Sequence, residues 1–346
     1  AQQTRQILDR MIGFKISPMI SRLEYHKSQN VLSAGRCQTP ALRLIYDNNI
    51  KNIDHNYKLE YLVSARFLNS LELQLSSNLK YESNECINFL NNSTCFSHVL
   101  SIKSIEIRSK LPPPPFNTSK LLQSASSELH ISPKETMLYC QNLYQDGHIT
   151  YMRTDSQRYS EYFLSQICVY IKDKYLLEKY IGDMNGLINE NKTAPHEAIR
   201  ITNLNTEMNK INGDKKQKLI YNLIRTRTIE SCMCPHVAEY HKVCISAPLK
   251  QEYTCEIEIG KFLGWKRFKI LETIFYKEQE KSVGMVSLIC NHNGKQVSYQ
   301  NIKCKVTSSN LSRHYSESEL IQKLEEIGIG RPSTYSLLVE TIKERK

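Results

Sequence analysis

The sequence lacks several features that would assign it at once to a class of protein. It has no unbroken apolar run of about 18 residues, which argues against a transmembrane helix and against a membrane partner. Its 11 cysteines form no Cys-x-x-Cys pair, which argues against a disulfide framework or zinc ribbon and favours reduced thiols in a cytosol. Residues 1–10 hold no signal-peptide core, and the absence of an initiator Met indicates an internal fragment of a longer chain.

What the sequence does contain is length and positive charge. The 346 residues are too many for one average core and predict two or three domains. Lysine and arginine outnumber aspartate and glutamate by 46 to 35, which gives a net charge of +11. A basic excess of this size favours a polyanionic partner, of which nucleic acid is the commonest. The alternative is a soluble protein that is merely basic.

Two stretches alternate between apolar and polar residues and predict β-structure. Residues 57–67 and 99–107 alternate in the first stretch, and residues 243–245, 253–259 and 296–306 look like strands in the second. The two stretches, roughly 50–110 and 238–310, flank a helical middle and are compatible with one β domain interrupted by a helical insertion. The polyproline stretch 112–115 marks the entrance to that insertion.

Two segments predict a pair of helices joined by a turn. Residues 118–129 form the first helix, Ser132 to Glu135 reads as a capping box for the second, Gly147 ends it, and a strand begins at Ile149. Near the C-terminus a helix spans 316–327, a turn follows, and Ser333 caps another helix. Helix, turn, helix and strand in this order are typical of a winged helix-turn-helix. A plain helical hairpin without a role in DNA binding is the alternative.

One short segment carries residues suited to nucleophilic chemistry. If residues 149–155 form a strand, alternation places Tyr151, Arg153 and Asp155 on one face. A phenol with a pKa near 10 is a poor nucleophile at neutral pH. A neighbouring guanidinium favours the phenolate and also binds the phosphate under attack. Tyrosine beside arginine is therefore what covalent attack on a phosphodiester requires.

Three further segments supply groups that bind phosphate. Residues 33–40 form a loop of small residues that carries Arg36 and Gln38. Residues 195–200 place His196 and Arg200 on one face if the segment is helical. Residues 329–334 bring two glycines, an arginine and hydroxyl groups to a helix N-terminus, which is an anion site.

Taken together, these segments resemble the type IA DNA topoisomerases. The segment YMRTDS at 151–156 is similar to the active-site motif of that family, in the variant typical of bacterial topoisomerase I rather than topoisomerase III. Four other family motifs occur in the same order along the chain. They are DRMIG at 9–13, SAGRCQ at 33–38, HEAIR at 196–200 and GIGRPSTY at 328–335, together with the proline run at 112–116.

The resemblance implies an α+β multi-domain fold. The family core is a torus with winged-helix domains and a β-rich arch. On that plan, residues 1–48 begin a DNA-gripping helical domain and residues 49–110 begin the arch. Residues 111–237 are the catalytic winged-helix domain, 238–312 complete the arch, and 313–346 continue the gripping domain.

The resemblance also implies roles for individual residues. Tyr151 attacks one DNA strand and forms a 5′-phosphotyrosine, while Arg153 positions and neutralises the scissile phosphate. His196 contacts a neighbouring phosphate and supports proton transfer, and Asp155 holds that histidine or the local backbone. The residues that grip the single strand are Ser33, Arg36, Gln38, Arg200, Arg331, Ser333 and Thr334.

The implied enzyme is an ATP-independent isomerase that relaxes negative supercoils. Its partner is DNA, chiefly single-stranded regions, and the resemblance places it in the cytoplasm at the nucleoid as a monomer. The family holds Mg²⁺ through a Toprim domain with a DxDxE cluster, which is not found in these residues. We therefore expect no metal or zinc site in this chain. Without Toprim, the isolated chain should bind DNA but should not relax negatively supercoiled plasmid, with or without Mg²⁺. One alternative is a non-catalytic remnant that binds single-stranded DNA. Another is a tyrosine recombinase, but those enzymes place their arginine and histidine residues before the tyrosine, whereas here Tyr151 precedes His196 and Arg200.

Overall fold

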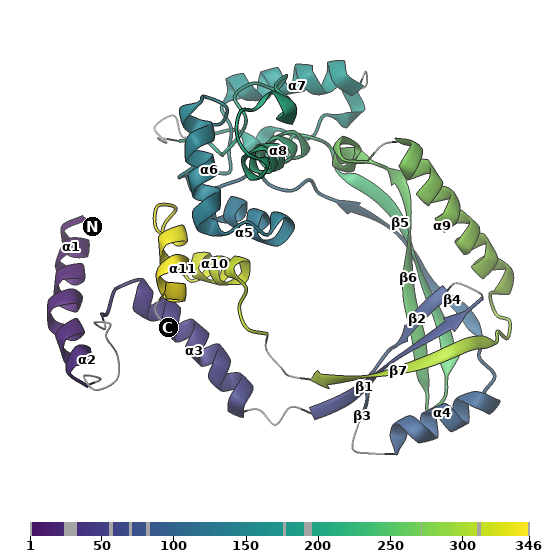
Figure 1. The fold of residues 1–346 in the computed structure, drawn as a ribbon. Coiled ribbons are helices and arrows are strands. Elements are labelled where there is room, and N and C mark those ends of the chain that lie inside the picture. The colour runs from purple at the N-terminus through teal and green to yellow at the C-terminus, as the bar shows by residue number, and fades with distance from the viewer. Residues whose placement is uncertain are drawn as a thin grey trace.

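The computed structural model describes residues 2–23, 33–54, 58–68, 71–80, 84–175, 178–189, 196–270, 272–309 and 313–344. A curled antiparallel sheet with helices α4 and α9 beside it occupies one side of the molecule, and the other helices occupy the opposite side (Figure 1). From α3 onward the elements follow one another around a ring, in which the last helices return to the side of α5. None of the helices within the described ranges is both long and apolar enough to cross a membrane.

The sheet has seven strands and joins the two β-rich stretches of the sequence. Its strands are β1 (Lys58–Phe67), β2 (Leu71–Leu75), β3 (Leu79–Lys80), β4 (Leu100–Lys110), β5 (His236–Ala247), β6 (Gln251–Phe262) and β7 (Tyr299–Ser309). The order is β3-β1-β2-β6-β5-β4, and β7 pairs with β1. Strand β4 pairs with β5 from Leu100 opposite Ile245 to Lys110 opposite His236. Both β-rich stretches therefore contribute strands to one sheet, and the helical residues between β4 and β5 separate them in the sequence.

Two helices lie beside the sheet, α4 (Glu85–Cys95) and α9 (Glu272–His292). Phe67, Phe89 and Tyr253 are fully buried and pack their rings at the centre of the core between α4 and the strands. Alternate residues of β2 are buried and exposed, as expected for a strand with one solvated face. The alternation of apolar and polar residues that predicts these strands therefore arises because one face of the sheet is buried.

The inserted helical part lies between β4 and β5. Its long helices are α5 (Thr118–Leu129), α6 (Pro133–Gln145), α7 (Glu161–Tyr175) and α8 (Lys215–Glu230). The predicted helix 118–129 is confirmed as α5, and the predicted capping box of Ser132 and Glu135 starts α6. Gly147 has a φ of +74°, which agrees with the predicted end of that helix.

The remaining helices lie at the two ends of the chain. They are α1 (Gln2–Met11), the π-helix η1 (Ile12–Ile16), α2 (Ser17–Leu23), α3 (Gln38–Asp54), α10 (Glu317–Glu326) and α11 (Tyr335–Glu344). Helix α10 starts with a capping box of Ser316 and Glu319, close to the predicted start. The predicted cap at Ser333 is wrong, because α11 begins at Tyr335 and Leu338 N donates to Thr334 O.

Helices α10 and α11 pack against α5 and α6 and complete the ring. Leu121 of α5, Cys140 of α6, Leu324 of α10 and Leu338 of α11 belong to one buried cluster. At its edge, the carboxylate of Glu325 accepts hydrogen bonds from three side chains at the start of α5. The donors are Asn117 Nδ2 at 3.2 Å, Ser119 Oγ at 2.8 Å and Gln123 Nε2 at 3.4 Å. We call these four residues the ring contact.

Near the centre of the helical part, the predicted strand at 149–155 is wrong, and the condition under which His196 and Arg200 would share a helix face is not met. Residues 149–155 form no continuous strand, and Ile149 makes a single bridge to Ile201. Residues 196–200 are extended rather than helical, because Ile199 N donates to Phe116 O and Thr150 N donates to Arg200 O. Backbone hydrogen bonds to distant segments therefore determine the conformation of residues 196–200, whatever their local helix propensity. Pro195 of the same motif lies outside the described residues.

Candidate active site

The predicted catalytic residues line one cavity of about 520 Å³. We call it the tyrosine cavity, and its lining residues are Tyr151, Arg153, Thr154, Asp155, Ser156, His196, Arg331, Pro332 and Ser333. Three segments meet here: the turn after α6, the extended segment at His196 and the turn before α11. The structure thus brings together the four predicted catalytic residues and two of the predicted phosphate-binding residues.

The start of α5 holds the tyrosine segment in place. Thr118 Oγ1 donates to Met152 O at 2.7 Å and accepts from Thr154 N at 2.9 Å. Met152 and Thr154 are buried, with 1% and 5% of their surface exposed. Because alternate residues point inward, Tyr151 and Arg153 point outward. The predicted common face is therefore present although the predicted strand is not.

Tyr151 lies against two other rings. Its ring centroid is 4.6 Å from that of His196 and 5.4 Å from that of Tyr144. The Tyr144 contact is edge-to-face, which is a favourable arrangement of aromatic rings. Within the described residues, the hydroxyl of Tyr151 has no hydrogen-bond partner. A half-buried phenol held by its ring, with its oxygen unpaired, is positioned to react with a bound group.

The charged groups of the cavity are open to a ligand. Arg153 and Asp155 are exposed, and neither forms an ion pair with any residue that the structure describes. The guanidinium of Arg153 is therefore available to an anion. His196 is also exposed, and its ring stacks obliquely on Tyr151 rather than hydrogen-bonding to Asp155. Phenol, guanidinium and imidazole in one cavity are the groups needed to bind and attack a phosphate ester.

A second cavity of about 520 Å³ adjoins the first, because Arg331 lines both. We call it the arginine cavity, and its lining residues are Arg5, Arg36, Cys37, Gly328, Ile329, Gly330, Arg331 and Thr334. The loop before α3 and the turn before α11 both line this cavity. Both segments were predicted to bind phosphate. Arg5 was not predicted, because a single basic residue in a polar helix carries no local signal.

The turn before α11 depends on two glycines. Gly328 and Gly330 have φ values of +73° and +88°, which residues with a side chain rarely adopt. A Cβ atom at Gly330 would lie 3.0 Å from the ring of Tyr335. The turn is closed by Arg331 N, which donates to Thr334 Oγ1 at 2.8 Å. Arg331 Nη1 donates to Gly330 O at 2.7 Å, so the guanidinium is held over its own turn.

The other residues predicted to bind the DNA strand lie in different surroundings. Arg36 lines the arginine cavity and forms an ion pair with Asp9 at 3.0 Å. Ser33 is exposed in the loop and Gln38 begins α3, and neither lines the two cavities. Arg200 faces the interior, where it pairs with Glu197 at 2.6 Å and stacks 4.0 Å above the ring of Phe163. The structure therefore does not bring Arg200 to either cavity.

The donor atoms do not fit a magnesium site. Mg²⁺ prefers oxygen ligands in octahedral geometry and is held through carboxylates. The tyrosine cavity is lined by one carboxylate, that of Asp155. In the parts of the chain that the structure describes, no three His, Cys, Asp or Glu residues are grouped to hold a metal ion. We therefore derive no step through a metal from these residues.

The fold and the site define a mixed helix-and-sheet protein in which a tyrosine, a histidine and two arginines line one cavity. The sequence model of the DNA topoisomerase family matches residues 1–346, and the chain belongs to that family, in its type IA topoisomerase I branch. It is 31% identical to DNA topoisomerase 1 of Pasteurella multocida and 33% identical to that of Aquifex aeolicus. The whole chain is covered in both cases, with 40% and 62% of the respective relatives.

A solved structure agrees with the sequence comparison. Full-length topoisomerase I from Thermotoga maritima superposes with a TM-score of 0.77 and 26% identity. The match covers 99% of this chain and 56% of that one. The chain therefore spans about two fifths to three fifths of the length of the relatives it matches.

Proposed function

We propose that the chain is the core of a type IA topoisomerase that cuts one DNA strand, lets another pass and reseals the cut. One observation carries this proposal: Tyr151, Arg153 and His196 line a single cavity that adjoins a second cavity with three arginines. A nucleophile beside a basic path is what cleavage of a bound strand requires. The family membership supports the same conclusion.

The proposed covalent step exchanges one phosphate ester for another. The oxygen of Tyr151 loses its proton and attacks the phosphorus, and the bond from phosphorus to the 3′ oxygen breaks. The 5′ phosphate is then esterified to Tyr151, and the leaving 3′ oxygen takes up a proton. Arg153 would neutralise charge on the phosphate, and His196, whose ring lies beside Tyr151, would support proton transfer. Resealing is the reverse, so no ATP is needed.

The arrangement of cavities supports a path for the cut strand. A single strand that reaches Tyr151 would pass Arg331 and then Arg36 and Arg5. Arg331 and Thr334 flank the glycine turn, and we retain them with Ser333 as strand contacts. We retain Ser33, Gln38 and Arg200 as weaker candidates, since they line neither cavity. Asp155 would orient water or backbone near the phosphate.

We extend the proposal to the whole ring. The sheet is the arch of the family torus, α5 and α6 belong to a winged-helix catalytic domain, and strand passage requires the ring contact to open. The substrate is single-stranded DNA in negatively supercoiled molecules, bound by a monomer in the cytoplasm. Mg²⁺ belongs to the Toprim domain that the family resemblance implies. The ring arrangement in Figure 1 supports the assignment of the arch, and the family membership supports DNA as the substrate.

A chimera tests the proposed function. The segment of the Aquifex aeolicus relative that matches this chain is replaced by the chain, and relaxation of negatively supercoiled plasmid is measured with Mg²⁺. We expect relaxation that Tyr151→Phe abolishes and that Tyr162→Phe retains, because Tyr162 is 74% exposed and lines neither cavity. A folded chimera that binds single-stranded DNA but does not relax plasmid would favour the non-catalytic alternative.

A further inference from the structure

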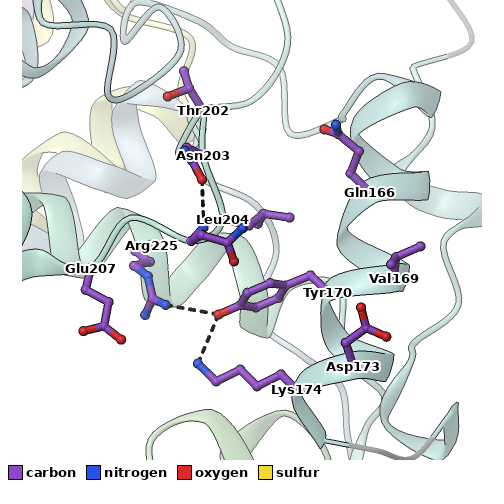
Figure 2. A pocket seen from close by; sticks show the side chains of 11 residues that line it. Gln166, Val169, Tyr170, Asp173, Lys174, Thr202, Asn203, Leu204, Glu207 and Arg225 are labelled. Carbon is purple, nitrogen blue, oxygen red and sulfur yellow. Dashed lines mark hydrogen bonds between the residues drawn. The ribbon is translucent and has the colours of Figure 1, made fainter.

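A third cavity, of about 840 Å³, lies between α7, α8 and the segment that follows Arg200. Its lining residues are Gln166, Val169, Tyr170, Asp173, Lys174, Thr202, Asn203, Leu204, Asn205, Glu207 and Arg225. Figure 2 shows polar side chains from all three segments around it. We call it the outer cavity, and neither the catalytic step nor the proposed strand path uses it.

The deepest charged group of the outer cavity is Arg225. Its residue surface is only 8% exposed, yet it forms no ion pair within the part of the chain that the structure describes. Among the described residues, its guanidinium makes one hydrogen bond, from Nη2 to the hydroxyl of Tyr170 at 3.1 Å, and its Nε has no hydrogen-bond partner there. Its guanidinium also lies over the ring of Phe268, at 5.3 Å from the ring centroid. A buried guanidinium without a carboxylate beside it is costly, and an anion in the cavity would supply the missing counter-charge.

Other hydrogen-bond donors line the same cavity. Lys174 Nζ donates to the hydroxyl of Tyr170 at 3.0 Å, so this one oxygen lies between two cations (Figure 2). Asn203 Oδ1 accepts from Asn205 N at 2.9 Å. With its oxygen used in that bond, the side-chain amide of Asn203 has its nitrogen as the remaining polar group, and an amide nitrogen is a hydrogen-bond donor. Guanidinium, ammonium and amide donors around a space are suited to phosphate oxygens.

The acidic residues of the cavity limit the charge of the anion. Asp173 and Glu207 are exposed, as is Lys174, whereas Arg225 is buried. The four formal charges sum to zero, so the cavity is poorly suited to a dianion. A phosphodiester carries a single negative charge, which Arg225 can balance in the interior while the exposed groups stay solvated. This favours the backbone of a nucleic acid over free phosphate.

The cavity is connected to the active site by one extended segment. His196 lines the tyrosine cavity, and Thr202 lines the outer cavity six residues later. Thr202 N donates to His148 O and Thr150 N donates to Arg200 O, so this segment pairs with the residues just before Tyr151. Six extended residues span about 20 Å. A DNA strand held at Tyr151 could reach the outer cavity with a few nucleotides.

We propose that the outer cavity binds a backbone phosphodiester of the DNA strand, with Arg225, Lys174 and Asn203 as its ligands. The site is a second anchor for the strand, on the far side of the segment that carries His196. The inference rests on the proposed function, because it requires that the chain binds DNA. It does not depend on the chemistry at Tyr151.

Two neighbouring exposed residues of α7 provide a test in which the expected effects have opposite signs. Lys174→Gln removes a ligand, whereas Asp173→Asn removes a competing negative charge. Lys172→Gln is the matched control, because Lys172 lies on the same helix, pairs with Glu178 and does not line the cavity. Each variant is measured by fluorescence anisotropy with an oligothymidylate of about 16 nucleotides, at salt concentrations from about 50 to 200 mM.

One lost phosphate contact lowers the slope of log affinity against log salt by about 0.7, which is about fivefold in affinity at 0.1 M salt. We expect this loss for Lys174→Gln, tighter binding for Asp173→Asn and an unchanged slope for Lys172→Gln. Equal slopes for Lys174→Gln and the unchanged chain, with binding intact, would overturn the site and leave the proposed function standing. No binding by the unchanged chain would instead contradict the proposed function.

Hydrogen exchange then identifies what occupies the cavity. We expect the oligonucleotide to protect amides of residues 202–207, and we expect no protection from an oligonucleotide with a neutral methylphosphonate backbone. Arg225→Gln should remove the protection. Protection by inorganic phosphate or thymidine monophosphate but not by the oligonucleotide would overturn the phosphodiester assignment.

Discussion

Removal of the Glu325 carboxylate should weaken the ring contact by an amount that the structure allows us to work out. Glu325 accepts from Asn117, Ser119 and Gln123, and the first two are 7% and 2% exposed. In Glu325→Ala the donors at the start of α5 lose their acceptor where water has little access. An unsatisfied buried donor costs about 1–3 kcal/mol, so we expect about 2 kcal/mol.

Hydrogen exchange at the start of α5 measures this loss locally. A loss of about 2 kcal/mol in opening free energy raises the exchange rate about 30-fold. The matched control is Glu326→Ala, because Glu326 is the next residue and, among the described residues, pairs with Gln322 and Lys323 of its own helix rather than with α5. We expect the control to change the free energy by less than about 0.5 kcal/mol. Equal exchange in the two variants would show that Glu325 does not hold the ring closed.

Three further predictions concern packing, pH and catalysis. Leu324→Ala, in the buried cluster of α5, α6, α10 and α11, should lower the free energy of unfolding by about 3 kcal/mol in denaturant unfolding. Leu337→Ala, at a 65% exposed position, should lower it by less than about 0.5 kcal/mol. Equal effects of the two substitutions would contradict the packing of Leu324 in that cluster. Burial raises the pKa of Glu230 from 4.5 to about 7, so the folded chain binds its proton more tightly than the unfolded one. Stability should fall as pH rises across that range, and Glu230→Gln should abolish this fall in unfolding curves. Arg153→Ala should slow strand cleavage by about 100- to 1,000-fold in a single-turnover assay of the chimera, and an equal loss with Arg158→Ala would refute a specific role.

The parts of the fold that the sequence predicts are those set by local patterns. The capping box of Ser132 and Glu135 fixes the start of α6, and alternation from 57 to 67 predicts β1. Helix α9 was not predicted, because most of its surface is exposed and only Val286 and Ile289 of its described side chains are buried. A helix with so narrow an apolar stripe gives little periodic signal.

The sequence motifs predicted which residues belong to the candidate site, but not the contacts that the segments around it make with distant parts of the chain. The tyrosine cavity contains Tyr151, Arg153 and His196 as expected, but the segment at His196 is extended because it pairs with residues near Phe116 and Thr150. Such pairing is set by tertiary structure and overrides local propensity. The contact of Glu325 with α5 joins residues about 200 positions apart, so no local pattern could have indicated it.

Identification of the amino acid that becomes linked to DNA tests the central claim most directly. The chimera is incubated with a labelled single-stranded oligonucleotide, the reaction is stopped with denaturant, and the linked peptide is sequenced by mass spectrometry. The proposed mechanism predicts a 5′-phosphate on the oxygen of Tyr151 and no adduct in Tyr151→Phe. An adduct on the neighbouring Tyr144, or one that persists in Tyr151→Phe, would show that another residue is the nucleophile.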